Sequence, residues 1–304
     1  MDFKSFQELS ELVKAFPRKT GVAVAMAQDY HTLEAVSKAA REGLIRAWLL
    51  GSKEEITAIL KELGESEDNY TILEEPDAKS CMRKAAQLVY EGKAGAIMKG
   101  KMETGQIMKG ILDKENGLRK GGLISLTGFY ESPYYHKMFA VTDQAINIAP
   151  DLDGKKEILE NAVDAMHMLG NPNPKVACLC AVEKVNPKMP ETEDAAELKE
   201  LNLKGEITGC VVEGPISLDL AMVRGSASVK GYESPVAGDA DLMVVPNLVS
   251  GNLMVKAITE VGGGQTGGLV LGAKVPVILV SRAATAEDKF NSIALAAYIG
   301  NKLS

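Results

Sequence analysis

The sequence predicts an α/β fold in which parallel strands alternate with helices. Short apolar runs and segments of helical spacing alternate before residue 123, and the same alternation resumes after residue 153. Loops rich in Gly, Pro, Ser, Asp or Asn follow many of the apolar runs. This order is typical of βαβ units around a buried parallel sheet, whose strand-end loops collect ligands at one edge.

The first part of the chain shows the alternation most regularly. Apolar residues at helical spacing predict an opening helix that Pro17 ends, and Ser52 and Glu55 form a capping box that opens another helix. The predicted strands are 21–26, 46–51, 70–73 and 94–100, and the further helices are 31–43, 78–90 and 104–112.

The pattern changes near residue 123. The runs 123–130, 137–143 and 145–150 follow one another without helices between them, which predicts antiparallel strands and a change of domain. The segment 223–238 is rich in Gly and Ser and lacks periodicity, so it predicts a mobile loop. The remaining predicted helices are 154–169, 192–201, 217–225, 250–261 and one from Thr285, and the strands are 175–182, 208–214, 241–246, 267–272 and 275–280.

Composition limits the class of protein. A chain of 304 residues is long for one core and predicts two domains. A net charge of −7 with 5% aromatic residues argues against nucleic-acid and anionic-membrane partners, and no apolar run approaches the roughly 20 residues of a membrane span. Four cysteines without a signal peptide predict a cytoplasmic protein with free thiols. Cys178 and Cys180, two apart in a predicted strand, are expected to be buried rather than to bind metal.

Two lysines and a threonine lie between a predicted strand and a predicted helix. Lys99, Lys101 and the hydroxyl of Thr104 would surround a helix N-terminus, whose free amides and dipole favour anions. The alternative is that Thr104 only caps its helix and that the lysines are solvated. Spacing alone leaves both interpretations open.

A hydroxyl, a cation and a carboxylate follow the last predicted strand. Arg282 at the end of a strand is suited to clamp phosphate or carboxylate, and Ser281 precedes it. None of the three histidines is well placed as a base, so Asp288 is the candidate proton acceptor. Thr285 and Asp288 also have the spacing of a capping box, and that alternative stays open.

Other polar residues beside predicted strands are weaker candidates. Asn247 follows one strand, and Asn252 lies near the start of the next helix. Asp239 and Asp241 could bind a divalent cation, although residues of this kind more often organise a turn. The glycine run 262–268 follows a helix and precedes a strand, the reverse of a dinucleotide-binding fingerprint, and it predicts a helix end with a tight turn.

Several long motifs resemble the phosphotransacetylase/phosphotransbutyrylase family in order along nearly the whole chain. They are KGKMETG (99–105), FAVTDQAINIAPDL (139–152), GPISLDLA (214–221), SPVAGDADLMVVPN (234–247), GN (251–252) before a helix, and VLGAKVPVILVSRAATAED (270–288). The chain length and the segment 142–152 are more similar to the phosphate butyryltransferase branch than to the acetyl branch.

The resemblance implies a fold, an activity and an assembly. The fold would be isocitrate/isopropylmalate dehydrogenase-like, with two three-layer αβα domains around a cleft. Residues 1–126 and 272–304 would form the first domain, and 127–271 the second, which would also form a homodimer or larger assembly. The activity would be interconversion of acyl-CoA and phosphate with CoA and acyl phosphate in a ternary complex.

The resemblance also implies roles for individual residues. Asp288 would take the proton of the CoA thiol, Ser281 would stabilise the tetrahedral oxyanion, and Arg282 would hold the phosphoryl oxygens. Coenzyme A would be a substrate, with no tightly bound cofactor and no metal. Position in the sequence, and not the resemblance, makes Lys99, Lys101, Thr104, Asn247 and Asn252 further candidate contacts to phosphate or CoA.

Three alternatives to a butyryl-transferring enzyme stay open. The nearest is the same reaction on an acetyl group. A second is a metal- and NAD(P)-dependent decarboxylating dehydrogenase on the same fold, with Asp239 and Asp241 as metal ligands. A third is a protein that binds acyl-CoA without catalysis.

Overall fold

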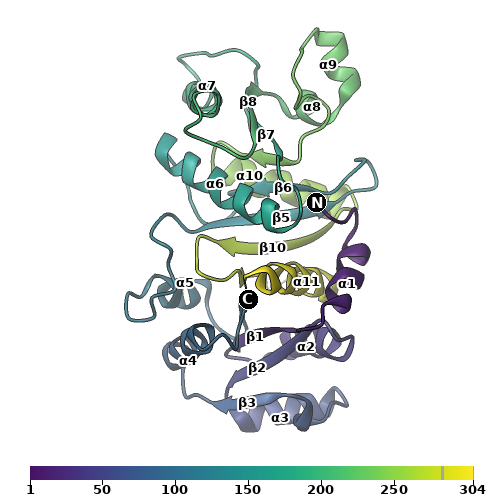
Figure 1. Cartoon of the computed structure of the whole chain (residues 1–304), viewed down its shortest axis with the longest axis vertical. Helices are drawn as coiled ribbons and strands as arrows, with labels where there is room; N and C mark the ends of the chain where they lie inside the picture. The colour runs from purple at the N-terminus through teal and green to yellow at the C-terminus, as the bar shows by residue number, and fades with distance from the viewer. Residues whose placement is uncertain (282–283, 304) are drawn as a thin grey trace. The chain divides into compact units, whose positions relative to one another are not determined.

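The chain divides into two compact units in a computed structural model that describes residues 1–281 and 284–303. We call Phe6–Gly122 with Gly267–Ser304 the terminal unit, and Met1–Ser5 with Leu123–Thr266 the middle unit. The first five residues belong to the middle unit, where the Asp2 N–H donates a hydrogen bond to the Leu169 carbonyl at 3.0 Å. Figure 1 labels the elements of each unit. The independence of two domains with the expected boundaries stays a prediction.

The terminal unit is built on a mostly parallel sheet with strand order β3-β2-β1-β4-β11-β10. Strands β3, β2, β1, β4 and β11 are parallel to one another, and β10 pairs antiparallel with β11. Its strands are β1 (Thr20–Ala25), β2 (Ile45–Gly51), β3 (Thr71–Glu74), β4 (Ala96–Lys99), β10 (Gln265–Leu271) and β11 (Val277–Ile278). The first four match the strands predicted from the apolar runs, and their parallel pairing confirms the predicted βαβ units.

Helices connect the parallel strands of the terminal unit. They are α1 (Phe6–Ala15), α2 (Tyr30–Arg41), α3 (Lys53–Glu62), the 3₁₀ turn η1 (Glu67–Asn69), α4 (Ala78–Tyr90), α5 (Thr104–Leu112) and α11 (Ala286–Lys302). The chain steps outward from β1 to β3 and then returns to β4, so right-handed crossovers place α4 on the face opposite α2 and α3. Helix α11 packs against α1, α2 and β1, and it is buried from Lys289 to Gly300.

The middle unit has strand order β5-β6-β9-β7-β8. The antiparallel pair β5–β6 confirms the predicted change of pattern, and the other neighbours are parallel. Its strands are β5 (Ser125–Glu131), β6 (Phe139–Thr142), β7 (Lys175–Leu179), β8 (Val211–Ile216) and β9 (Leu242–Val244). Its helices are α6 (Leu152–Met168), α7 (Pro190–Leu203), α8 (Leu218–Met222), α9 (Arg224–Lys230), α10 (Leu248–Lys256) and the π-helical turn η2 (Ala257–Val261).

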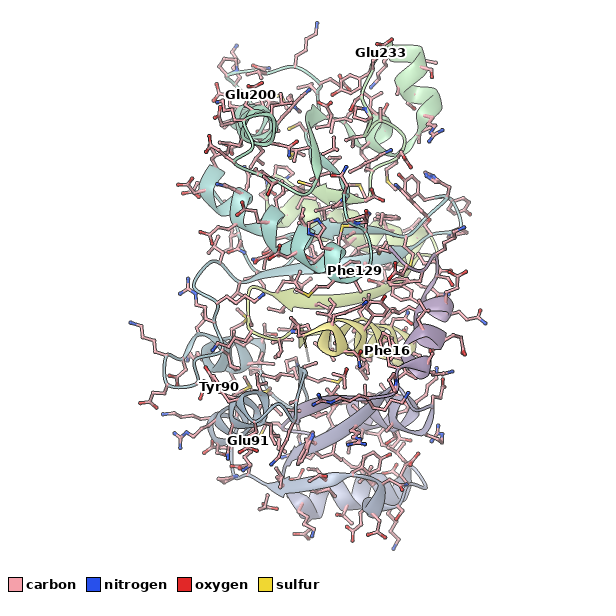
Figure 2. The ribbon with its side chains drawn as sticks, viewed as in Figure 1. Phe16, Tyr90, Glu91, Phe129, Glu200 and Glu233 are labelled. Atoms are coloured by element: carbon pink, nitrogen blue, oxygen red, sulfur yellow. The ribbon has the colours of Figure 1, made fainter. Side chains whose placement is uncertain are left out.

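Burial follows the apolar pattern of the strands. Tyr130 of β5 and Phe139 of β6 stack with ring centroids 5.6 Å apart in the core of the middle unit. Phe129 is also fully buried, whereas Glu91, just after α4, and Glu200 of α7 are exposed (Figure 2). None of the helices in the described part of the chain has the length and apolar content needed to cross a bilayer.

Two expectations about the middle unit were wrong. Residues 145–150 form no strand, because the Asp143 carboxylate accepts hydrogen bonds from the backbone N–H groups of Ala145, Ile146 and Asn147 at 2.9–3.1 Å. The segment 223–238 is not simply a loop, because it contains helix α9. That helix ends at Gly231, whose φ of 61° gives it the left-handed conformation that glycine adopts readily.

All four cysteines are free and buried, as predicted for Cys178 and Cys180. Burial raises the pKa of the Cys81 and Cys210 thiols to about 11 and that of Cys180 to about 12. A thiol of pKa about 11 has roughly 200-fold less thiolate at pH 8 than an ordinary cysteine.

We therefore expect a disulfide reagent to react with the native protein at least about 200-fold more slowly than with free cysteine at pH 8. The release of thionitrobenzoate from Ellman's reagent measures the rate, and unfolding in guanidinium should expose four reactive thiols. A thiol that reacts within seconds in the native protein would contradict the burial.

Candidate active site

The candidate site lies at the carboxyl ends of adjacent parallel strands in the terminal unit. Strands β1, β4 and β11 are neighbours, and each is followed by a loop and then by a helix. The amino ends of α2, α5 and α11 therefore follow the same edge of the sheet, where free backbone N–H groups favour anions. A pocket of about 440 Å³ lies there, in the range of small-molecule sites.

Lys99 and Lys101 both line this pocket, and their binding of an anion stays a prediction. Lys99 ends β4 with 9% of its surface exposed, and its ammonium donates to the Met102 carbonyl at 3.1 Å. Lys101 is exposed, and its ammonium lies 3.4 Å from the Glu55 carboxylate. The two lysines therefore differ, because one is built into the loop and the other extends into solvent.

Gly100 allows the loop between these lysines to approach the neighbouring loop closely. Its N–H donates to the Ala25 carbonyl at 2.9 Å, and the N–H of Lys101 donates to the Met26 carbonyl at 2.7 Å. A Cβ atom at Gly100 would lie 2.1 Å from the Met26 carbonyl oxygen. The loop after β4 is thus fastened to the loop after β1 by backbone contacts that leave no room for a side chain.

Thr104 does not cap its helix, so that alternative was wrong. Helix α5 begins at Thr104, and the capping position belongs to Glu103, whose N–H donates to the Gln106 side-chain carbonyl at 2.8 Å. Glu103 and Gln106 line the pocket. Thr104 is exposed on the first turn, and its contact with phosphate stays a prediction.

Ser281 lines the pocket, whereas Arg282 lies outside the described residues. The Ser281 carbonyl accepts a hydrogen bond from the Ala284 N–H at 3.1 Å. The structure therefore places Ser281 at the pocket. The roles of Ser281 and Arg282 in catalysis stay predictions.

Asp288 forms the capping box that its spacing allowed. Its carboxylate oxygen Oδ2 accepts from the Thr285 N–H at 3.0 Å, and the Thr285 hydroxyl accepts from the Asp288 N–H at 3.1 Å. These hydrogen bonds engage Oδ2 and leave Oδ1 outside the cap. The half-buried carboxylate is thus held in place at the first turn of α11, and its role as proton acceptor stays a prediction.

Two basic residues of the lining, His31 and Lys289, were not among the sequence candidates. His31, at the start of α2, is largely exposed and lies 3.6 Å from the Glu34 carboxylate. Lys289 follows Asp288 and is only 5% exposed. The sequence does show that Lys289 directly precedes the mostly apolar segment 290–299. A lysine next to a buried helical segment is itself expected to be at least partly buried, which is unusual for a charged residue.

Asn247 and Asn252 belong to the middle unit. Asn247 follows β9 and caps α10, because its side-chain oxygen accepts from the Ser250 N–H at 3.0 Å. Asn252 lies within α10 and is half-buried. The residues that share the terminal unit are Lys99, Lys101, Thr104, Ser281 and Asp288.

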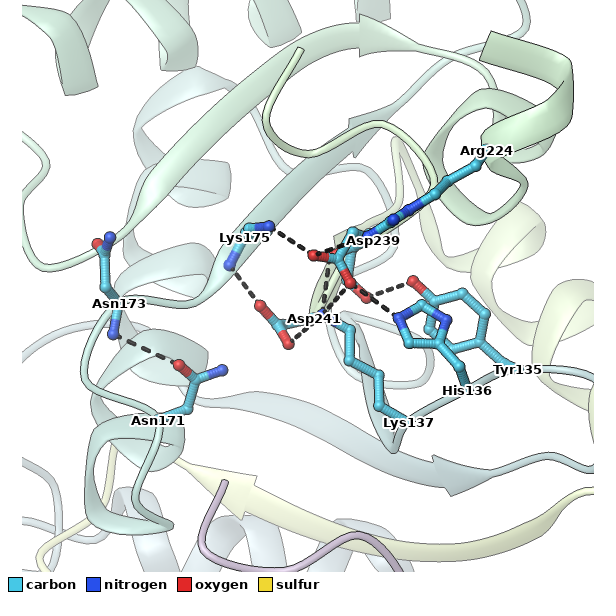
Figure 3. A network of polar contacts seen from close by, with 10 residues as sticks. Tyr135, His136, Lys137, Asn171, Asn173, Lys175, Arg224, Asp239 and Asp241 are labelled. Atoms are coloured by element: carbon cyan, nitrogen blue, oxygen red, sulfur yellow. Dashed lines mark hydrogen bonds and ion pairs between the residues drawn. The ribbon is translucent and has the colours of Figure 1, made fainter. Parts of the chain in front are cut away.

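Asp239 and Asp241 lie at the amino ends of strands, where they are neutralised by cationic side chains (Figure 3). Asp239 is 2.5 Å from the Lys175 ammonium and 2.8 Å from the His136 ring. Lys137 is 2.7 Å from Asp241 and 3.0 Å from Asp239. The two carboxylates therefore join the starts of β6, β7 and β9, which agrees with an organising role and not with a vacant pair of metal ligands.

Because of this network, part of the protein's free energy of unfolding should depend on pH. Burial acts to raise the pKa of Asp239, but hydrogen bonds from Lys175, His136 and Lys137 outweigh it and hold the pKa well below its usual range. A depressed pKa in the folded state contributes stability above the unfolded-state pKa of about 4, and that contribution is lost as the pH falls toward the folded-state value.

We expect Asp239→Asn to be less stable than the wild type at pH 6, with the difference shrinking below pH 4. Urea unfolding midpoints at pH 6 and pH 3 measure this change. An equal difference at both pH values would contradict the ion-pair network as its source.

The strand order and the pocket at the carboxyl edge define an α/β protein of the class that binds ligands at strand ends. Solved structures of other proteins share this fold. A branched-chain phosphotransacylase from Enterococcus faecalis V583 matches 92% of this chain and 99% of its own, with a TM-score of 0.83 and 32% identity. A 4-hydroxythreonine-4-phosphate dehydrogenase from Klebsiella pneumoniae matches 93% of this chain and all of its own at a TM-score of 0.56 and 15% identity. The dehydrogenase-like fold is thereby confirmed.

The chain belongs to the phosphate acetyl/butyryl transferase family, because the family model described as phosphate acetyl/butaryl transferase matches residues 72–297. A phosphate butyryltransferase from Clostridium acetobutylicum is 43% identical over 98% of this chain and 99% of its own. A phosphate acetyltransferase from Thermotoga maritima is 39% identical over 96% and 98%. These relatives confirm the resemblance found in the sequence motifs.

Proposed function

We propose that this protein is an acyltransferase that interconverts acyl-CoA and phosphate with CoA and acyl phosphate, and that butyryl is its preferred acyl group. One observation of the structure carries the proposal: a pocket lined by lysines at the carboxyl ends of β1, β4 and β11. Family membership gives the reaction class, and the butyryltransferase relative at 43% identity supports the acyl group.

The reaction requires a proton acceptor and groups that bind anions. In the direction of acyl-CoA synthesis, the CoA thiol loses its proton, the sulfur bonds to the carbonyl carbon, and the bond from that carbon to the phosphate oxygen breaks. A thiol has a pKa well above 7, so a base assists the attack. Asp288 is the proposed base, because the capping box holds its carboxylate while Oδ1 stays outside the cap.

Hydrogen-bond donors and cations stabilise the negative charge that develops during the attack. Ser281 is the proposed hydrogen-bond donor to the tetrahedral oxyanion, a kind of contact worth about 3 kcal/mol. Arg282, Lys99 and Lys101 are proposed to bind phosphoryl oxygens, with Thr104 as a further contact. Asn247, which follows β9, and Asn252, within α10 of the middle unit, are proposed contacts to phosphate or CoA.

Three further properties are part of the proposal. We propose that CoA is bound only as a substrate and that no cofactor is held tightly. We propose a cytoplasmic location, and a homodimer or larger homo-oligomer with contacts in the middle unit. Light scattering after gel filtration would measure the mass of the assembly against the 32.4 kDa chain.

The deciding experiment is release of CoA from acetyl-, propionyl-, butyryl- and isobutyryl-CoA with inorganic phosphate, in buffer containing EDTA. We expect the highest kcat/KM with butyryl-CoA and full activity in the chelator. A maximum with acetyl-CoA would replace butyryl by acetyl. Activity that requires a divalent ion and NAD(P) would favour the dehydrogenase alternative, and binding without CoA release would favour the acyl-CoA-binding alternative.

A further inference from the structure

Lys289 is a buried cation at the wall of the pocket. It is the fourth residue of α11, and only 5% of its surface is exposed. Its ammonium donates to the Ala284 carbonyl at 3.3 Å. Among the described residues, no carboxylate lies within 4.0 Å of it. Lys289 is therefore a buried charge that makes no direct ion pair with any carboxylate in the described part of the chain.

Another buried lysine in the same chain shows the usual arrangement. Lys155 is 7% exposed, and its ammonium lies 2.5 Å from the Asp194 carboxylate. Burial of an ammonium without such a partner is unfavourable, because the charge loses water and gains no opposite charge. Lys289 lies where a ligand could supply that charge.

The neighbours of Lys289 in the pocket favour an anion. Lys99, also buried, lines the same pocket, and the amino ends of α2, α5 and α11 follow the same sheet edge. Of the two carboxylates in the lining, Asp29 accepts from the Thr32 N–H at 2.9 Å and from its hydroxyl at 2.6 Å, and Glu103 lies exposed at the start of α5.

Lys289 and Asp288 are adjacent in sequence, but their side chains contact different parts of the protein. Asp288 is bound to the backbone of Thr285 at the cap, whereas Lys289 lines the pocket. We propose that Lys289 binds a phosphate-type anion in this pocket, either the phosphate that is transferred or a phosphate group of coenzyme A. The naming of these two sources rests on the proposed function, whereas the anion site itself rests on the buried ammonium.

The first test is binding without turnover. Inorganic phosphate stabilises a protein that binds it in the folded state, so it should raise the melting temperature of the wild type. Lys289→Met keeps an apolar side chain of similar length and removes the charge. We expect this variant to melt at or above the wild-type temperature without phosphate and to lose the phosphate-dependent rise. Lys302→Met, on the exposed end of the same helix, is the matched control and should keep the rise.

The second test identifies the source of the anion. We expect Lys289→Met to raise a KM by about 10- to 100-fold, the range for loss of a hydrogen bond to a charged group. A rise confined to phosphate assigns the contact to the transferred phosphate, and a rise confined to acyl-CoA assigns it to the phosphate groups of CoA.

Two results would overturn the inference. One is a phosphate-dependent rise in melting temperature as large in Lys289→Met as in the wild type. The other is an unchanged KM for both substrates. Absence of CoA release by the wild type would refute the proposed function alone, because the melting experiment needs no catalysis.

Discussion

Asp288→Asn lowers kcat by about 10²- to 10⁴-fold if Asp288 is the proton acceptor, because asparagine cannot take the proton of the CoA thiol. The same substitution keeps an oxygen that can accept the Thr285 N–H, so the hydrogen bond of the cap survives. Loss of the negative charge at the amino end of α11 costs only about 0.3–1 kcal/mol. Activity should therefore fall steeply while the fold changes little.

The matched control for this variant is Thr285→Ala. It removes the hydroxyl that accepts the Asp288 N–H and leaves the backbone N–H that holds the Asp288 carboxylate. We expect a loss of about 1 kcal/mol in the free energy of unfolding and a kcat within a few-fold of the wild type. Steady-state CoA release and urea unfolding measure both quantities for both variants. An Asp288→Asn protein with normal kcat and a lower melting temperature would show that Asp288 is only a cap.

Much of the terminal unit could be predicted because its signals are local. The apolar runs that became β1 and β2 are bounded by polar and glycine residues, and the Thr285–Asp288 spacing correctly predicted a capping box. Capping and strand burial depend on residues a few positions apart, which a sequence displays directly.

The missed features depend on contacts between distant segments or on a choice between hydrogen-bond partners. The apolar run 145–150 had the composition of a strand, but the Asp143 carboxylate took the backbone N–H groups that a strand would pair. Helix α9 forms despite low intrinsic propensity, with Ala227 buried in the core and Gly231 at its end. Composition and periodicity alone therefore gave the wrong assignment in both places.

The candidate site shows the same division between local and distant signals. Lys99 and Lys101 could be found because they follow an apolar run and precede a helix. The sequence signal of Lys289 indicates only a buried lysine, because its place in the pocket depends on the pairing of β11 with β4, which brings residues about 180 positions apart to one sheet edge. A sequence does not display that adjacency.

Gly100→Ala tests how the pocket is held together, and we expect it to damage both stability and activity. The new Cβ would lie 2.1 Å from the Met26 carbonyl oxygen and 2.9 Å from that of Ala25. These are backbone atoms at the end of β1 and in the loop that follows it, so they cannot rotate away as a side chain would. The loop after β4 must move, and the Gly100–Ala25 and Lys101–Met26 hydrogen bonds must stretch or break.

The size of the effect follows from these contacts. Overpacking of this kind costs about 1–3 kcal/mol, and loss of one or both hydrogen bonds adds about 1–2 kcal/mol, so we expect a loss of about 2–5 kcal/mol in the free energy of unfolding. Because Lys99 and Lys101 flank Gly100, a shift of about 1 Å would also displace the pocket's cations and lower kcat/KM by about 100-fold.

Gly105→Ala is the control, because it lies in the first turn of α5 and a Cβ there meets no atom within 4 Å. Alanine favours the helix by about 0.5–1 kcal/mol, so this variant should be at least as stable as the wild type with unchanged kcat/KM. Urea unfolding and CoA release distinguish the two glycines. If Gly100→Ala matched Gly105→Ala in both measurements, the close approach of the two loops would not be what positions the lysines.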